Sequence, residues 1–137
     1  MGWIVAGALS ALLFTGIVVK SRRGETGSTL SPAALLGRIN GQNDLLVLDV
    51  RTPGEYKSGH IVGAINIPHT ELSGRVDALQ SHRDKDVVVL CERGPRARTA
   101  QQILGEAGFP HVYHLEGDMA GWRRNGYPVD SGAAVAE

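Results

Sequence analysis

Cysteine is almost absent from this sequence, because the chain of 137 residues contains only one, Cys91. A disulfide within the chain is therefore excluded, and cysteine usage does not indicate an oxidising or a reducing compartment. A resolving thiol is missing for the same reason. A sulfur atom carried by Cys91 would therefore have to leave to an acceptor outside the chain.

Net charge is also absent, and aromatic side chains are few. The 14 Lys and Arg residues balance the 14 Asp and Glu residues, and aromatic residues make up 5% of the sequence. Nucleic-acid-binding domains usually carry a basic excess or aromatic residues interleaved with basic ones. The composition argues against a nucleic-acid partner, and the length leaves room for one soluble domain and little else.

Charged side chains are missing from residues 1–19, which would be apolar on every face of a helix. A helix of this length covers about 28 Å, close to the ~30 Å hydrocarbon core of a membrane. A cleavable signal peptide would have basic residues before the run and a small-residue cleavage site after it, whereas here Lys20, Arg22 and Arg23 follow the run. A buried core helix would be shorter or amphipathic.

We therefore expect residues 1–23 to form an uncleaved transmembrane helix with a basic flank. The basic flank predicts a single-pass protein of the cell membrane whose soluble domain lies in the cytoplasm. Small polar residues at 24–30 predict a flexible tether, and the Ser, Gly and Ala residues of 130–137 predict a disordered tail. The folded domain is expected over residues 31–129.

Helix and strand patterns alternate through this domain. Strands are predicted at four short apolar runs, residues 45–48, 64–67, 87–90 and 112–115. Helices are predicted after Ser31-Pro32, after Thr52-Pro53 with Glu55 completing a capping box, at Leu72, Val76 and Leu79, at Ala100 to Ala107, and through Trp122. The most continuous strand runs are typical of a sheet buried on both faces. The order predicts an α/β fold with a doubly wound parallel sheet flanked by helices, preceded by one transmembrane helix.

Cys91 stands where a predicted strand ends and a predicted helix is about to begin. Ligands of doubly wound folds bind at the carboxyl ends of the strands, and a short loop before a helix aims backbone N–H groups and a positive dipole end at one point. The alternative is that Cys91 is a small buried apolar residue. Arg93, Arg96 and Arg98 favour the reactive, anion-holding site.

Three segments carry a resemblance to a known family. They are residues 48–68, with Leu48-Asp49-Val50-Arg51, Glu55-Tyr56, Gly59-His60-Ile61 and Gly63-Ala64-Ile65-Asn66-Ile67-Pro68; the loop Cys91-Glu92-Arg93-Gly94-Pro95-Arg96; and residues 112–122, with Val112-Tyr113-His114-Leu115-Glu116-Gly117 and Gly121-Trp122. In this order they resemble the rhodanese (sulfurtransferase) family. The resemblance implies a rhodanese-like fold over residues 31–129, and single-pass anchored rhodanese domains occur in bacteria.

The resemblance also implies a chemistry. Cys91 as a thiolate attacks the outer sulfur of a donor such as thiosulfate, sulfite leaves, and a thiophilic acceptor removes the sulfur from the Cys91 persulfide. The loop residues Glu92, Arg93, Gly94, Pro95 and Arg96 are expected to bind the substrate, with Arg93 or Arg96 holding its sulfonate end. We expect no cofactor and no metal.

Three further residues of the motif are expected to be structural. Asp49 and Arg51 end a buried strand, and buried charges need partners, so an internal ion pair or hydrogen bonds to neighbouring loops are expected. His60 is expected to be a hydrogen-bonded structural residue. His111 and His114 are three apart on a predicted strand and would point to opposite faces, which argues against a shared metal.

Two positions depart from the family pattern. Asp118 follows Gly117 where many family members have a second glycine, and Asp tolerates the left-handed backbone that such a position can require. Ala97 stands where many relatives have a small hydroxyl residue, which removes one possible hydrogen-bond donor near the thiolate.

Other functions on a similar loop remain open. A phosphatase or arsenate reductase would have a loop one residue longer, with arginine as the sixth residue after the cysteine, whereas here that residue is Ala97. A persulfide carrier that delivers sulfur to a protein partner at the membrane would need the same cysteine and loop. A non-catalytic interaction domain would usually have lost Cys91.

The topology of the chain can be tested with its only thiol. We expect a membrane-impermeant maleimide to label Cys91 after lysis but not in intact cells or spheroplasts, with the uncleaved chain in the membrane fraction. Equal labelling before and after lysis would place the domain outside. Recovery of a soluble protein beginning after residue 20 would contradict the anchor itself.

Overall fold

The apolar runs of the sequence form a parallel sheet in the computed structural model, which describes residues 27–41 and 44–133. The sheet has five strands in the order β1-β6-β5-β2-β4, every neighbouring pair is parallel, and β3 and β7 form a separate antiparallel pair. The strands are β1 (Thr29–Leu30), β2 (Leu45–Asp49), β3 (His60–Ile61), β4 (Ile65–Asn66), β5 (Asp86–Leu90), β6 (Val112–Leu115) and β7 (Val129–Asp130).

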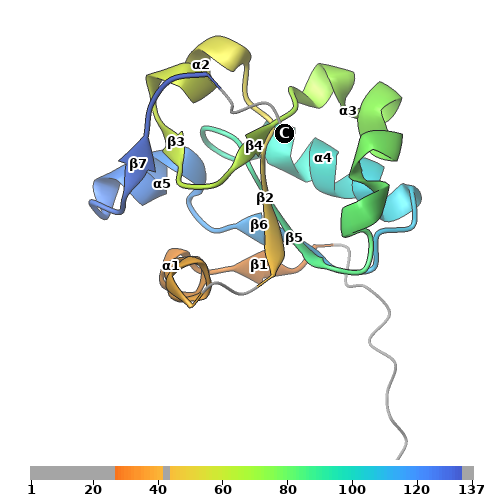
Figure 1. Ribbon diagram of the computed structural model, residues 1–137, viewed down its shortest axis with the longest axis horizontal. Coiled ribbons are helices and arrows are strands. Elements are labelled where there is room, and N and C mark those ends of the chain that lie inside the picture. Colours follow the sequence, from red (N-terminus) through yellow and green to blue (C-terminus); the bar gives the residue numbers. More distant parts are fainter. Residues whose placement is uncertain (1–26, 42–43, 134–137) are drawn as a thin grey trace, which may run out of the picture.

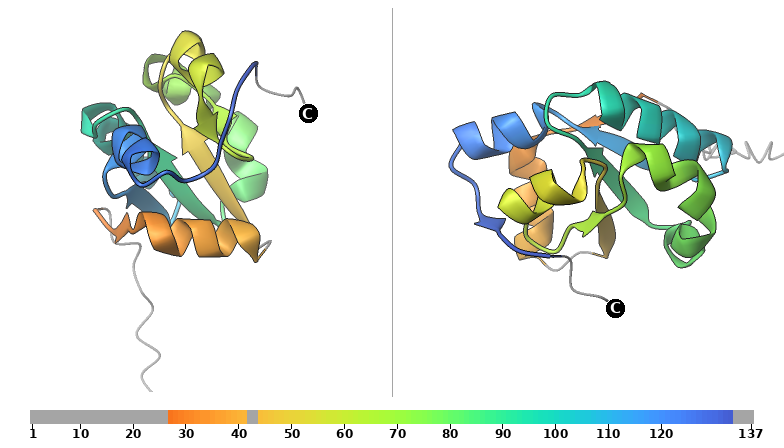
Figure 2. Two further views of the ribbon diagram at one scale, coloured as in Figure 1. Left: turned by 90° about the vertical axis from the view of Figure 1, so that its left-hand side faces the viewer. Right: turned by 90° about the horizontal axis from the view of Figure 1, so that it is seen from above.

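Helices cover both faces of the five-stranded sheet (Figure 1). One face carries α1 (Pro32–Asn40), α2 (Pro53–Ser58) and α5 (Asp118–Arg124), and the other carries α3 (His69–Arg75), the 3-10 helix η1 (Val76–His82) and α4 (Pro95–Glu106). The view from above in Figure 2 places the same helices on the same two sides. The predicted α/β fold with a parallel sheet flanked by helices is confirmed.

The helix starts follow the capping chemistry expected from the sequence. Ser31 accepts a hydrogen bond from the N–H of Ala34 through its side chain, at 3.1 Å. Thr52 and Glu55 form a reciprocal capping box at the start of α2. Each cap satisfies N–H groups that have no partner within the first turn of a helix, so local sequence determines where α1 and α2 begin.

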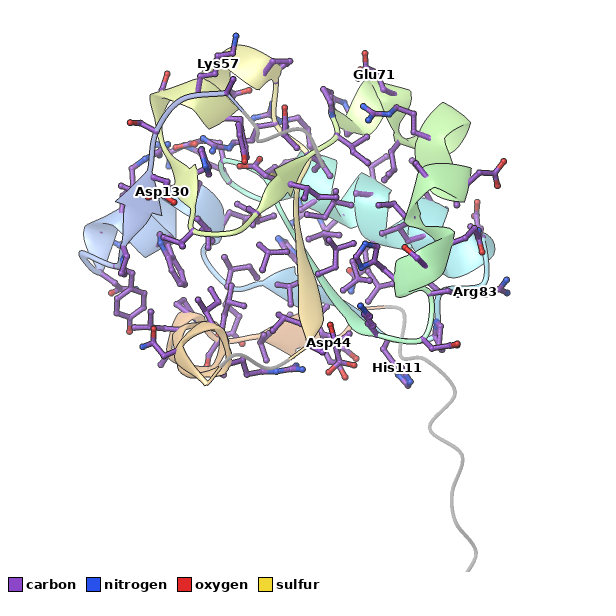
Figure 3. All side chains as sticks on the ribbon, in the orientation of Figure 1. Asp44, Lys57, Glu71, Arg83, His111 and Asp130 are labelled. Carbon is purple, nitrogen blue, oxygen red and sulfur yellow. The ribbon has the colours of Figure 1, made fainter. Side chains whose placement is uncertain are left out.

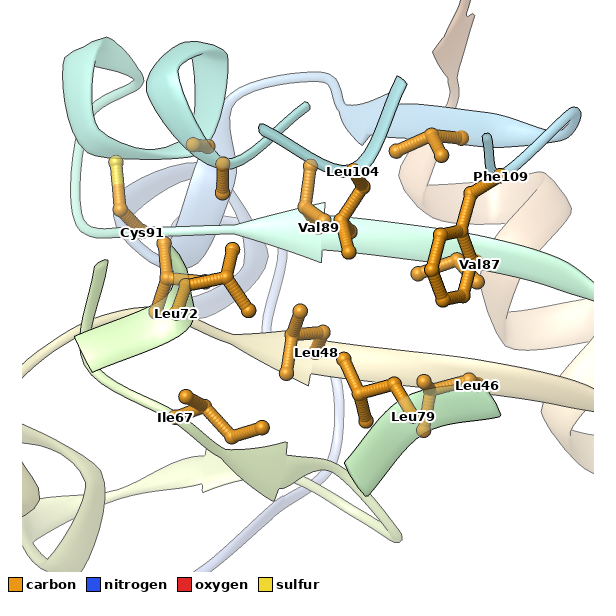
Figure 4. Close-up of a cluster of buried hydrophobic side chains, with 14 residues drawn as sticks. Leu46, Leu48, Ile67, Leu72, Leu79, Val87, Val89, Cys91, Leu104 and Phe109 are labelled. Carbon is orange, nitrogen blue, oxygen red and sulfur yellow. The ribbon is translucent and has the colours of Figure 1, made fainter. Parts of the chain in front are cut away.

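The core lies in two layers, one on each face of the sheet. The central strands β2 and β5 contribute side chains to both layers. In β5, Val87, Val88, Val89 and Leu90 are each 0% exposed. Figure 4 shows one layer, with Leu48, Val89 and Leu104 between the sheet and α4 and with Cys91 at the end of the row of side chains. Cys91 is thus held by the same packing that holds the sheet.

Asp44 and His111 directly precede β2 and β6 and lie at the end of the sheet where the strands begin (Figure 3). All strands of this sheet run in the same direction, so their carboxyl ends lie together at the opposite end of the sheet. Cys91 directly follows β5 and lies at that carboxyl end.

Three boundaries differ from the sequence prediction. The predicted tether at 24–30 is wrong at its end, because Thr29–Leu30 pairs with β6 as β1. The predicted tail at 130–137 is wrong at its start, because Val129–Asp130 pairs with β3 as β7. The helix expected at Leu72, Val76 and Leu79 is divided into α3 and η1. The two-residue strands β1, β3 and β7 lack the apolar run that predicted β4, and they form because a partner strand lies beside each of them.

The predicted membrane helix lies at residues 1–19, outside the residues that the structure describes. Among residues 27–41 and 44–133, no helix is long and apolar enough to cross a membrane. The membrane anchor therefore stays a prediction from the sequence.

The stability of the sheet can be tested with two matched valines. Val89 is 0% exposed in β5, whereas Val62 is 38% exposed. We expect Val89→Ala to lower the free energy of unfolding by about 2 kcal/mol, because it removes buried apolar surface and leaves a cavity. Val62→Ala is the control and should leave the urea midpoint almost unchanged. Equal shifts in both variants would contradict this description of the core.

Candidate active site

Cys91 is enclosed by the residues that follow it. The residue is 1% exposed, and the backbone N–H of Gly94 donates to its Sγ at 3.0 Å. The backbone N–H of Cys91 donates to Oδ1 of Asp118 at 3.1 Å. Figure 4 shows the sulfur directed toward α4, whose first turn follows the loop. A positive helix end and a loop N–H therefore face the sulfur, which is an arrangement that stabilises a negative charge.

Gly94 is required by the backbone of this loop. Its φ angle is +127°, and an added Cβ would lie 2.9 Å from Nη1 of Arg98 and 3.3 Å from Oδ2 of Asp118. A side chain here would strain the backbone and collide with its neighbours. Glycine thus lets the loop turn tightly enough to place its N–H on the sulfur.

A buried arginine links the sheet to this loop. Arg51 is 1% exposed and donates to Asp49 Oδ2 at 2.7 Å and to the carbonyl oxygen of Gly59 at 2.7 Å. A longer contact of 3.4 Å reaches Oε2 of Glu92, and Oε1 of Glu92 accepts from Arg123 at 2.6 Å. Burial alone would lower the pKa of Arg51, but the hydrogen bond and the attraction of Asp49 raise it above its ordinary value. The internal ion pair expected from the sequence is present.

Arg96 is paired with Glu55, which is far away in the sequence. Its Nη1 and Nη2 donate to the two carboxylate oxygens of Glu55 at 2.7 and 3.0 Å. The hydrogen bonds from Arg96 lower the pKa of Glu55 from its ordinary 4.5 to about 2. Because Glu55 also caps α2, the pair joins the start of α2 to the start of α4.

Asp118 and His114 complete the surroundings of the sulfur. Oδ1 of Asp118 lies 3.7 Å from Sγ of Cys91 and 2.9 Å from Nε2 of His114. The φ angle of Asp118 is +53°, the only positive value among the non-glycine residues that the structure describes. The left-handed backbone that Asp tolerates is therefore present, and the side chain that stands in place of glycine reaches Cys91.

Comparison with known proteins identifies this arrangement. The sequence profile described as the rhodanese-like domain matches residues 31–125. The chain belongs to this family. A protein named sulfurtransferase, from Allochromatium vinosum, is 32% identical over 96 residues, which cover 70% of this chain and 88% of that protein. Sulfur transfer is accordingly the chemistry of the family to which this rhodanese-like domain belongs.

Two further relatives extend the comparison. A rhodanese-related protein from Thermoplasma volcanium superposes with a TM-score of 0.68 at 34% identity, covering 77% of this chain and 99% of that one. An HTH-type transcriptional regulator of Mycobacterium tuberculosis is 40% identical over 115 residues, which cover 82% of this chain. This rhodanese-like domain spans about half of that regulator, 49% of its length.

The five loop residues expected to bind substrate differ in their exposure. Gly94 is buried, Glu92 and Arg96 are half-buried and engaged in ion pairs, and Pro95 and Arg93 are exposed. Arg93 has no ion pair or side-chain hydrogen bond within residues 27–41 and 44–133. Of the two arginines proposed for the sulfonate, Arg93 is therefore available without breaking an internal contact.

His60 lies away from the sulfur. Its ring stacks on Tyr56 with a centroid distance of 3.7 Å, and its Nδ1 is 2.8 Å from the carbonyl oxygen of Tyr56. Both side chains line a cavity of about 630 Å³ beside β4, whose lining includes Asp130 but no residue of the Cys91 loop. His60 thus has the buried, hydrogen-bonded environment expected from the sequence.

Sequence reasoning did not place Asp118 and His114 beside the thiol. Asp118 was singled out for its backbone alone, and His114 was considered only as a metal ligand. The described residues contain no cluster of His, Cys, Asp and Glu suited to a metal ion. The useful signal was the replacement of an expected glycine by an acidic residue at the first position of α5. This helix packs against the Cys91 loop through the bond from the Met119 N–H to the Cys91 carbonyl at 3.0 Å.

The Glu55–Arg96 pair predicts a specific pH dependence of stability. Because the folded state lowers the pKa of Glu55, the pair contributes stability above pH 4.5 and loses it as the pH falls toward about 2. We expect Glu55→Gln to reduce the free energy of unfolding at neutral pH, with a difference from the wild type that stays constant down to about pH 4.5 and then shrinks as the pH falls toward about 2.

Urea unfolding at a series of pH values measures this difference. Glu71→Gln is the control, because Glu71 lies on the surface of α3 (Figure 3) in an exposed pair with Arg75 at 3.7 Å. A difference between the wild type and Glu55→Gln that does not change with pH would show that the ion pair is not its source.

Proposed function

We propose that this rhodanese-like domain moves sulfane sulfur from a donor such as thiosulfate to a thiophilic acceptor through a persulfide on Cys91. The observation that carries the proposal is the Gly94 N–H at 3.0 Å from Sγ, in a loop that leads into the start of α4. This environment suits a sulfur that is anionic before and after the transfer. A buried cysteine with a purely packing role would not need a donor aimed at its sulfur.

The transfer takes place in two displacement steps. The Cys91 thiolate forms a bond to the outer sulfur of thiosulfate, the bond between the two sulfur atoms of the donor breaks, and sulfite leaves with the electron pair. An acceptor thiolate or cyanide then forms a bond to the outer sulfur of the persulfide, and Cys91 is released as a thiolate. No second cysteine of the chain can take part, since Cys91 is the only one.

The donor is recognised by its negative charge. Arg93 is exposed beside the loop and has the planar geometry that suits a sulfonate. Arg96 instead positions the first turn of α4 through its pair with Glu55. In this proposal Arg93 contacts the donor, while Glu92, Gly94 and Pro95 shape the loop around the sulfur.

A persulfide carrier that serves a protein partner is the alternative. It is supported by the relative named as a transcriptional regulator, in which the matched region is about half of a longer protein. We also propose that residues 1–19 hold the domain at the membrane, from which such a partner would be reached. The carrier and the small-molecule enzyme share the first displacement step and differ in the acceptor.

Intact mass measurement tests the proposal. Incubation with thiosulfate is expected to add one sulfur atom to the purified protein, and cyanide is expected to remove it as thiocyanate. Cys91→Ser should lose both steps. An unmodified mass after saturating donor, in a folded and reduced protein, would contradict the sulfurtransferase function.

Two additional measurements separate the alternatives. A loaded persulfide that reacts slowly with cyanide and small thiols would favour the carrier. Hydrolysis of an aryl phosphate should be undetectable, because the loop between Cys91 and Ala97 is too short to surround a phosphate. Hydrolysis that depends on Cys91 and matches the rate of sulfur transfer would contradict this size argument.

A further inference from the structure

The carboxylate of Asp118 lies where an anionic sulfur has to form. Its Oδ1 is 3.7 Å from Sγ of Cys91, and the side chain is 4% exposed. A thiolate or persulfide at this distance from an ionised carboxylate is a pair of like charges shielded from water, and such pairs do not ionise together without compensation. A positive charge near Asp118, in addition to the Gly94 N–H and the start of α4, would therefore favour the proposed sulfur chemistry.

His114 is placed to supply that charge. Its Nε2 is 2.9 Å from the same Oδ1, and its side chain is 13% exposed. Imidazole is the side chain that takes up and releases a proton near neutral pH. We propose that Asp118 and His114 form a charge-compensating pair behind Cys91, in which protonation of His114 allows the sulfur to become anionic beside Asp118.

The protons and charges of the three groups balance. With a neutral imidazole, an ionised Asp118 and a Cys91 thiol, the three groups carry one negative charge. When the thiol loses its proton and His114 gains one, the groups are a thiolate, a carboxylate and an imidazolium, and the sum is unchanged. Asp118 stays ionised throughout and keeps the Nε2–H of His114 directed at Oδ1. Both residues are positioning residues, because they act on the charge of the sulfur rather than on the substrate.

The other charged groups around the sulfur keep the same charge over the neutral range. Arg98 of α4 lies close to Gly94, with its Nη1 2.9 Å from the point where a Gly94 Cβ would stand. Arg96 is neutralised by Glu55, and Glu92 lies between Arg51 and Arg123. Arginine stays protonated, so these groups set a constant background, and His114 is the one that changes.

The inference rests on the proposed function, in which Cys91 is the sulfur carrier, but its test needs no sulfur donor. The thiolate fraction is measured across pH by the ultraviolet absorbance of the thiolate, with Cys91→Ser as the reference. The variants are His114→Gln, whose amide can keep the hydrogen bond but not the charge, and Asp118→Gly, which suits the positive φ of +53°. His111→Gln is the matched control, because His111 directly precedes β6 whereas Cys91 directly follows the parallel strand β5.

In the wild type we expect the thiolate to appear in two steps as the pH rises, first beside the imidazolium and then after the imidazolium loses its proton. In His114→Gln a single step should remain, and the thiolate fraction at neutral pH should be several-fold lower, because no imidazolium is left to offset the carboxylate of Asp118. Asp118→Gly should also give a single step, but with no loss of thiolate at neutral pH. His111→Gln should match the wild type.

The double variant decides between charge compensation and a merely structural role. In the Asp118→Gly background, His114→Gln should change the thiolate fraction far less than in the wild type, because no carboxylate is left to compensate. Equal losses of thiolate in the two single variants, or two steps that persist in His114→Gln, would overturn the inference. Far-ultraviolet circular dichroism verifies that each variant is folded. A failure to take up sulfur from thiosulfate would count against the proposed function alone.

Discussion

The position of the Cys91 loop depends on one buried guanidinium. Arg51 joins the end of β2 to the backbone after α2 and to Glu92, so a single side chain touches three segments that are separate in the sequence. A buried cation is costly to remove from water, and it is tolerated because its donors are matched by Asp49, the Gly59 carbonyl and Glu92. Loss of Asp49 would leave an uncompensated charge under the loop, and the effect would reach the sulfur through Glu92.

Much of the fold could be predicted from the sequence because its signals are local. The apolar runs, the Ser31 cap and the Thr52–Glu55 capping box determine strands and helix starts within a few residues of themselves. The Cys91 loop was found for the same reason, since Gly94 and Pro95 lie next to the cysteine. The strands β1, β3 and β7 were not found, because none of them stands in an apolar run and their partners are distant in the sequence.

The site could be predicted only in part, for a related reason. The pairing of Arg96 with Glu55 spans 41 residues, and the contact of Asp118 with Cys91 spans 27. Contacts at such separations follow from how the strands are ordered in the sheet, which the pattern of a single sequence does not give. A left-handed backbone at position 118 accepts glycine or aspartate, so a charge could enter the site there without a change of fold.

The two hydrogen bonds between Glu55 and Arg96 connect the start of α2 directly to the first turn of α4. A helix of six residues is too short to persist by its own hydrogen bonds. Its cap, the contact of that cap with Arg96 and the buried side chain of Tyr56 hold α2 in place. Fraying of α2 therefore releases Arg96, and displacement of Arg96 removes a partner of the cap. Any local opening of α2 is therefore coupled to the first turn of α4, which directly follows the Cys91 loop.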